Sequence, residues 1–278
     1  GYPPPAAFRG DWMSVRWNRG PAAPAPNAGA EQPLLRAMMI NPSLQVLSMC
    51  GYYDLVCSYF GNQVAANGLD AGLKARVTVR AYAGGHAVYT DDPVRLEIKR
   101  DVSAFMQRAV GTAAAGGEQA PSTTPSGNGP DGITNHTITI DGRLLRYTAK
   151  AATLPIRVND TGEAHANVFY VSYSAAGTPG VRRPLTFLWN GGPGSNASLL
   201  HLTGFGPRRL ASSRGCVDCT IEDNDATWLE QSDLVFVDPV GTGFSRPTRA
   251  EYGAEFYNTL GDIASIAEFV RVYLTRHD

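Results

Sequence analysis

Short apolar runs alternate with amphipathic stretches along most of this chain. Residues 44–49 (LQVLSM) and 234–238 (LVFVD) have the length and composition of strands buried on both faces. Residues 34–40 and the stretch that begins at Thr259 are predicted to be helical, and in the latter the apolar side chains recur three and four positions apart. Buried strands that alternate with helices predict an α/β protein with a mainly parallel sheet.

Further elements follow from the same pattern. Residues 77–82 (VTVRAY), 167–173 (NVFYVSY) and 185–189 (LTFLW) are predicted strands. Residues 136–149 (HTITIDGRLLRYTA) alternate on either side of an Asp-Gly pair, which predicts a hairpin with a tight turn. A helix is expected from Asp92, whose side chain can cap it.

The chain divides at a stretch that lacks large apolar side chains. Residues 111–131 are rich in Gly, Pro, Ser and Thr, so they cannot bury enough surface to offset their chain entropy. We expect a flexible linker there. It joins one ordered segment within residues 1–110 to a second one at residues 132–278.

Composition and residue spacing exclude several classes of partner and cofactor. The 24 basic residues nearly balance the 25 acidic ones, which argues against nucleic acid or a membrane surface as a partner. No apolar run approaches the roughly 18 residues that a membrane span needs. Cys50 and Cys57 lack the spacing of zinc ligands, so we expect no metal and no cofactor. A disulfide between Cys216 and Cys219 is favoured if the protein is exported.

Three of the predicted strands end in loops with useful chemistry. Asp54 follows the first strand, His86 follows the next, and residues 190–194 (NGGPG) follow a third. A carboxylate that binds an imidazole fixes its tautomer, so that the other nitrogen can accept a proton from a nucleophile. A glycine-rich loop can direct free N–H groups at an oxyanion. Each of these features alone is more often part of an ordinary loop without catalytic function, but the three together favour a catalytic site.

Six stretches carry a specific resemblance: PLTFLWNGGPGSNAS, GFGPRR, DLVFVDPVGTGFS, NTLGDIASIAEFV, GYYDLVCSYFGN and AGGHAVYTDDP. They resemble the serine carboxypeptidase family, α/β hydrolases that remove C-terminal residues from peptides. The similar regions cover roughly residues 34–110 and 133–278. The resemblance implies an α/β-hydrolase fold, a peptide with a free C-terminus as substrate and an exported protein, although no signal peptide is visible.

The resemblance also implies roles for five residues. Asp54 is then the acid and His86 the base of a Ser-His-Asp triad. Gly192 donates an N–H to the oxyanion, and Asn190 and Gly191 bind the terminal carboxylate of the substrate. We expect no metal ligand among them.

Two departures from the family pattern affect these expectations. Gly204 stands where peptide-cleaving members often carry a Glu that contacts the substrate carboxylate, so an acyltransferase or esterase remains an alternative. His201, close by, is interpreted as a helix residue. The nucleophile motif Gly-x-Ser-x-Gly is absent, because Ser195 and Ser245 lack its second glycine. We therefore expect the serine to lie outside this chain, and the chain alone to be inactive.

The family's segments also appear in inverted order, with the Asp/His part first. Three interpretations remain open. The chain spans the junction of two tandem hydrolase domains, or it is a circularly permuted hydrolase, or it is a non-catalytic binding module that has kept hydrolase strands. We favour the first, in which residues 1–110 finish one domain and residues 132–278 begin another. An adjacent domain or chain then supplies the serine.

Overall fold

The computed structural model describes residues 31–113, 132–158, 161–176, 183–191, 194–211 and 220–277. Residues 31–113 are called the first segment below, and the described residues from 132 to 277 the second segment. The predicted linker lies outside the described residues from 114 onward. Its first three residues belong to a helix that ends at Ala113.

The first segment forms a small parallel sheet with helices around it. Its elements are α2 (Glu31–Ile40), β1 (Val46–Gly51), α3 (Tyr59–Asn67), α4 (Ala71–Lys74), β2 (Val77–Tyr82), η2 (Val88–Thr90) and α5 (Asp92–Ala113). β1 and β2 pair in parallel from Val46 opposite Val77 to Gly51 opposite Tyr82. The strands and helices predicted for this segment are confirmed.

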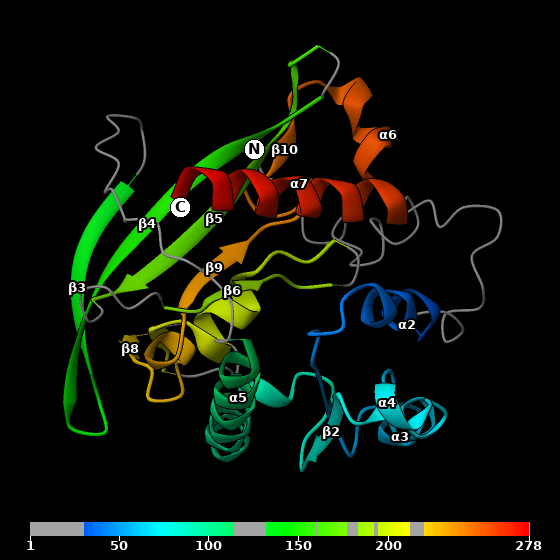
Figure 1. The fold of residues 1–278 in the computed structure, drawn as a ribbon. Helices are drawn as coiled ribbons and strands as arrows, with labels where there is room; N and C mark the ends of the chain where they lie inside the picture. The colour runs from blue at the N-terminus through cyan, green and yellow to red at the C-terminus, as the bar shows by residue number, and fades with distance from the viewer. Residues whose placement is uncertain are drawn as a thin grey trace.

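The second segment is built on a six-stranded sheet (Figure 1). Its strands are β3 (Gly132–Ile140), β4 (Arg143–Arg157), β5 (Ala164–Ala175), β6 (Leu185–Leu188), β9 (Asp233–Val237) and β10 (Arg246–Pro247). The order is β3-β4-β5-β9-β6, and β10 pairs with β5. The predicted hairpin is present as β3 and β4, where Asp141 and Gly142 both take positive φ angles, 48° and 77°.

The expectation of a mainly parallel sheet is corrected by this arrangement. Within this sheet, four described strand pairs are antiparallel, and the pair of β6 with β9 is parallel. For the pairs β3–β4 and β4–β5 the reason is the short stretch of sequence between the strands, since parallel neighbours need a long crossover. The broader class, a mixed α/β protein, stands.

Helices and short elements cover the second segment's sheet. They are η3 (Leu200–Phe205), β7 (Arg208–Leu210), β8 (Ile221–Asp223), η4 (Trp228–Glu230), η5 (Ala250–Tyr252), α6 (Gly253–Phe256) and α7 (Thr259–His277). Figure 1 shows α7 crossing one face of the sheet. Phe269 and Tyr273 of α7 pack their rings against Tyr170 of β5, each with centroids 5.5 Å apart. The buried face of α7 consists of Ser265, Ile266, Phe269 and Tyr273. The apolar stripe expected for this helix (Ile263, Ile266, Ala267, Val270 and Leu274) shares only Ile266 with that face, because Ile263, Ala267 and Leu274 are exposed. Among the described helices, none is long and apolar enough to cross a membrane.

The two segments share a hydrophobic core although their sheets do not pair. Val94, Ile98 and Val102 of α5 lie in the same buried cluster as Leu229 and Phe236 of the second segment. Ion pairs border this contact, with Lys99 of α5 2.5 Å from the carboxylate of Glu230. Burying a side chain such as Ile98 contributes about 1.5–3 kcal/mol, so α5 fixes the first segment firmly against the second.

Candidate active site

Asp54 and His86 lie just beyond the carboxyl ends of β1 and β2. Because these strands are parallel neighbours, the loops that follow them emerge side by side. The N–H of Tyr53 donates to the carbonyl of Gly84 at 3.0 Å and continues the pairing past the strands. A Cβ at Gly51 would collide with the carbonyl oxygens of Gly84 and Gly85, so only glycine permits this close approach.

The predicted acid and base are in direct contact. Nδ1 of His86 lies 2.9 Å from Oδ2 of Asp54. The Asp54 side chain is almost fully buried, whereas 64% of the His86 side chain is exposed. The other ring nitrogen of His86, Nε2, has no hydrogen-bond partner among the described residues. The pair thus has the form of an imidazole oriented by a carboxylate and free to exchange a proton on its other side.

Hydrogen bonds stabilise the charge on Asp54. Its Oδ1 accepts from the N–H groups of Val56, at 2.7 Å, and Cys57, at 2.9 Å. Burial by itself raises the pKa of Asp54, but the bonds from Cys57, His86 and Val56 together hold that pKa below its usual value. Asp54 is therefore ionised at neutral pH. It accepts the Nδ1 proton of His86, which selects the tautomer that leaves the Nε2 lone pair free.

The glycine loop is only partly within the described residues. Gly192, the predicted oxyanion donor, lies outside them. Asn190 is half-buried and Gly191 is exposed, with no atom within 4 Å of the place where a Cβ would stand. Past the loop, the N–H of Ala197 donates to Asp238 at the end of β9, at 3.0 Å. No hydrogen bond among the described residues joins Asn190 or Gly191 to the Asp54–His86 pair.

The two serines considered in the sequence differ in their surroundings. Ser245 is fully buried, and its hydroxyl donates to the carbonyl of Asp238 and accepts from the N–H of Phe169, both at 2.7 Å. Both hydrogen-bonding capacities are used, so Ser245 joins the loop after β9 to β5. Ser195 is exposed beside the glycine loop. Neither contacts His86 among the described hydrogen bonds.

His201 lies in a helical turn, as the sequence suggested, and its ring is packed into the protein. It belongs to η3, a π-helix, and Nε2 lies 2.5 Å from the hydroxyl of Tyr173. The ring stacks on Phe236 with centroids 4.5 Å apart. Burial lowers the pKa of His201 to about 4, so the ring is neutral at physiological pH.

The base loop touches the second segment near Gly204. Tyr89 in η2, three residues after His86, packs against Phe205 of η3 with ring centroids 5.6 Å apart. A Cβ at Gly204 would lie 3.3 Å from the Tyr89 ring, a tight contact. A glutamate at this position would require Tyr89 to shift. The geometry thus accounts for the glycine at the first departure from the family pattern.

Sequence reasoning missed the polar residues that hold this contact together. Asn224 is fully buried, and its amide donates to the carbonyls of Gly204, at 2.8 Å, and Gly206, at 2.7 Å. Its side-chain oxygen accepts from Arg95 of α5. Arg95 is also buried and forms an ion pair with Asp225 at 3.0 Å. Nothing in the local sequence distinguishes a buried arginine of this kind from one on a solvated helix face.

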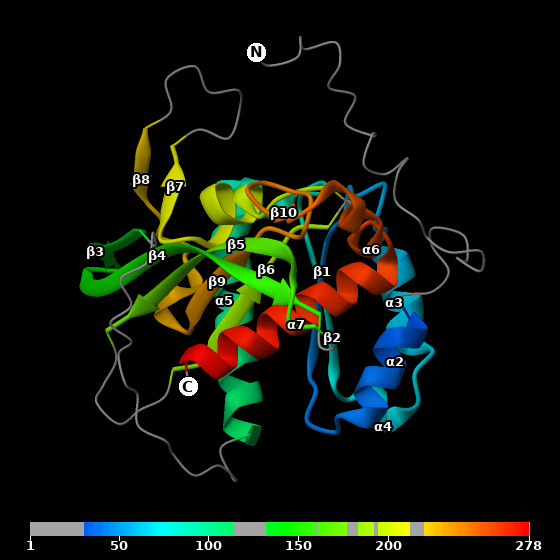
Figure 2. The same ribbon diagram turned by 90° about the horizontal axis from the view of Figure 1, so that it is seen from above.

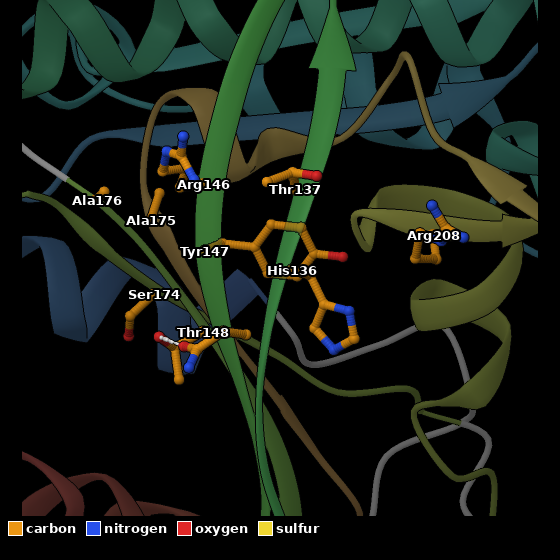
Figure 3. Close-up of a pocket in the computed structure, with 10 residues that line it drawn as sticks. His136, Thr137, Arg146, Tyr147, Thr148, Ser174, Ala175, Ala176 and Arg208 are labelled. Atoms are coloured by element: carbon orange, nitrogen blue, oxygen red, sulfur yellow. Dashed lines mark hydrogen bonds between the residues drawn. The ribbon is translucent and has the colours of Figure 1, made fainter.

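A separate pocket lies across strands β3 to β5 (Figure 3). Its volume is about 1040 Å³, and its lining includes Tyr147 on β4, His136 on β3 and Arg208 on β7. The ring of His136 stacks on Tyr147 with centroids 5.3 Å apart. None of the five predicted site residues lines this pocket, so it is distinct from the predicted active site.

Comparison with known proteins finds a matching family and several relatives, and the family match begins at residue 157. Residues 157–278 match the family described as serine carboxypeptidase. A pheromone-processing carboxypeptidase KEX1 of Komagataella phaffii is 29% identical over 133 residues, which are 48% of this chain and 19% of that protein. The protein of the same name from Phytophthora infestans is 31% identical over 134 residues, 48% of this chain and 20% of that protein. The one from Aspergillus terreus is 37% identical over 92 residues, 32% of this chain and 14% of that protein.

The matched part of the chain thus spans about a fifth of the first two relatives' length. The family match contains the glycine loop, η3 and α7, and it leaves out Asp54 and His86. These matches and the motifs quoted above agree on one family. Residues 157–278 of this chain thus match the serine carboxypeptidase family, and the relatives with similar sequences are carboxypeptidases.

Proposed function

We propose that this chain supplies the acid, the base and the oxyanion loop of a serine-type carboxypeptidase, and that the serine comes from another segment. The observation that carries the proposal is the 2.9 Å contact between buried Asp54 and exposed His86. A buried carboxylate holding an otherwise free imidazole is the arrangement that activates a serine hydroxyl. The family of residues 157–278 supplies the substrate class, a peptide with a free C-terminus.

The proposed reaction uses each residue in turn. Nε2 of His86 takes the proton of the incoming serine as its oxygen attacks the last peptide bond. Asp54 stabilises the imidazolium that forms, and the N–H of Gly192 donates to the oxyanion. Asn190 and Gly191 bind the terminal carboxylate. His86 then protonates the leaving amine, and water resolves the acyl-enzyme by the same steps.

The strand edges of the two sheets support the proposal that a central strand is supplied from elsewhere. β6 ends the six-stranded sheet, and β1 and β2 form a sheet of their own. In Figure 2 this smaller sheet lies to the right of β6 without joining it. Unpaired edges readily accept further strands. We infer that the nucleophile's strand belongs between β6 and the smaller sheet, where it would extend the parallel part of an α/β-hydrolase sheet.

An acyltransferase or esterase of the same family is the second candidate. The tight contact at Gly204 favours it, because no glutamate is present there to contact a substrate carboxylate. The two activities separate on substrate: a carboxypeptidase releases the last residue of a peptide, and an esterase cleaves small acyl esters but leaves peptides intact. A binding module without activity would do neither.

The direct test is reconstitution of the split site. This chain is co-expressed with a family segment that carries Gly-x-Ser-x-Gly, and the mixture is treated with a fluorophosphonate probe and with a peptide. We expect the serine to be labelled, and the C-terminal residue released, only when both are present. His86→Ala should abolish both, and His136→Ala, a surface histidine of β3, should abolish neither. Labelling of the segment alone, or labelling that survives His86→Ala, would refute the proposal.

A further inference from the structure

We propose that Asp54, Cys57 and His86 also bind a zinc ion. Each residue offers one ligand atom, and the three atoms lie within 4.8 Å of one another. The spacing of the cysteines along the chain gave no reason to expect a metal. The structure instead brings one cysteine together with a histidine and an aspartate from two separate loops.

The distances are close to those that zinc requires. Tetrahedral bonds of about 2.0–2.3 Å place neighbouring ligand atoms about 3.3–3.8 Å apart. If His86 binds through Nδ1, its 2.9 Å contact with Asp54 must lengthen, and separations of up to 4.8 Å in the cluster must shorten by up to about 1 Å. Cys57 and His86 are both exposed and lie in loops, where their side chains can turn. Asp54 is held in place by the N–H groups of Val56 and Cys57. The hydrogen bond from the backbone N–H of Cys57 also keeps the Cα of Cys57 beside the Asp54 carboxylate in any rotamer of the Cys57 side chain.

The ligand types select the metal. One sulfur, one nitrogen and one oxygen suit zinc, whereas magnesium and calcium prefer oxygen alone. Three protein ligands leave a fourth position for water. On binding, the Cys57 thiol releases its proton to solvent and the thiolate binds the metal. His86 would bind through one ring nitrogen and keep its proton on the other.

The consequence for catalysis rests on the proposed function, but the binding itself does not. A metal on Nδ1 replaces the hydrogen bond to Asp54, and a metal on Nε2 occupies the lone pair that would accept the serine proton. Either geometry removes the base. Zinc would therefore act as a reversible inhibitor of any enzyme that uses this acid–base pair.

The test uses the full 278-residue chain and cobalt as a spectroscopic substitute for zinc. Cys216 and Cys219 are first replaced by Ser, since that pair is another source of thiolates. Cobalt titration should then give a thiolate-to-cobalt absorption band that saturates at one equivalent and disappears when zinc is added. Absence of the band would overturn the proposal.

Single substitutions in that background locate the ligands. Cys57→Ser should remove the band, and His86→Ala should weaken cobalt binding by more than the roughly 10–100-fold that loss of an outer-shell partner costs. Cys50→Ser is the matched control, because Cys50 is buried and lies outside the cluster, and it should leave the band unchanged. A band that survives Cys57→Ser would contradict the assignment. Because no step requires activity, failure here and failure of the proposed function remain separate results.

Discussion

The two segments hold different parts of the proposed site, and only in the first segment does the structure describe predicted site residues in contact with each other. In the first segment, Asp54 and His86 already make their contact, because both follow strands of one parallel pair. In the second segment, the exposed Gly191 belongs to a loop that follows β6, a strand at the end of its sheet. Yet the family match covers the second segment and not the first. The family match and the assembled acid–base pair therefore lie in different halves of the chain, and the proposed activity would need both.

The two segments also differ in how completely their strands and apolar side chains are buried. The strand β9 is buried along nearly its whole length, whereas β1 is mostly half-buried. Next to Asp54, Leu55 is 99% exposed, and Phe60 and Val64 of α3 are also exposed. Clustered apolar side chains on a surface indicate an interaction site. The half with the assembled acid–base pair thus exposes large apolar side chains close to Asp54 in the sequence.

The largest effect should come from the first segment's acid. In the reconstituted enzyme, Asp54→Asn preserves shape but donates to Nδ1 and selects the wrong tautomer of His86, which typically costs about 10⁴ in turnover. Asp141→Asn, in a turn that Asn tolerates, is the control and should leave turnover unchanged. Steady-state peptide hydrolysis measures both. Turnover of Asp54→Asn within about twofold of the parent would remove Asp54 from the triad.

A second substitution tests whether the segments depend on each other for stability. Ile98→Ala removes a buried side chain of α5 from the shared core and should lower the free energy of unfolding by about 2–5 kcal/mol. Urea denaturation followed by circular dichroism gives this value. Leu96→Ala, on the exposed side of the same helix, should cost less than about 0.5 kcal/mol.

Hydrogen exchange then locates the effect of Ile98→Ala. If the segments unfold together, the amides of β9 in the second segment lose protection as well as those of α5. Unchanged protection in β9 would show that the second segment is stable without the first, and the comparison would then be between two independent units.

The corresponding change in the second segment tests the glycine loop. In the reconstituted enzyme, Gly192→Ala adds a Cβ to a loop that must face the reacting carbonyl, and loss of one oxyanion donor costs on the order of 10²–10³ in turnover. Gly132→Ala, with open space at the start of β3, is the matched control. Turnover and KM are measured together. A change in KM alone would make the loop a carboxylate-binding element.

Much of the fold could be predicted because its signals are local. The Asp141-Gly142 turn, the apolar runs of β1 and β9 and the helical conformation of α7 depend on neighbouring residues. The partners of a strand do not, and for this reason the antiparallel arrangement around β5 was missed: a strand buried on both faces has the same pattern in either direction.

The contact between Asp54 and His86 was predictable to the same extent, because each of the two residues follows a recognisable strand. The third member of the cluster, Cys57, and the buried Arg95 and Asn224 were not, since their neighbours come from other parts of the chain. Long-range contacts of this kind leave no periodic pattern in the sequence.

The smallest expected effect is a change in the free energy of unfolding with pH. It distinguishes His201 of the second segment from His86 of the first. Burial lowers the pKa of His201 in the second segment to about 4, from a usual pKa of 6.5. Between these values the unfolded chain binds a proton that the folded chain does not, so this contribution to stability is present above pH 6.5 and is lost as the pH falls toward 4. From pH 7 to pH 5 the loss amounts to about 2 kcal/mol.

Urea denaturation at these two pH values measures the loss. His201→Gln can still hydrogen-bond Tyr173 but cannot titrate, so its free energy of unfolding should fall less between pH 7 and pH 5 than that of the parent, by about 2 kcal/mol. His136→Gln, exposed on β3, is the control and should follow the parent. An unchanged pH dependence in His201→Gln would mean that His201 is solvated in the folded chain. The contrast between a half-buried, packed histidine in the second segment and an exposed, carboxylate-held one in the first would then fail, because both rings would be open to protons.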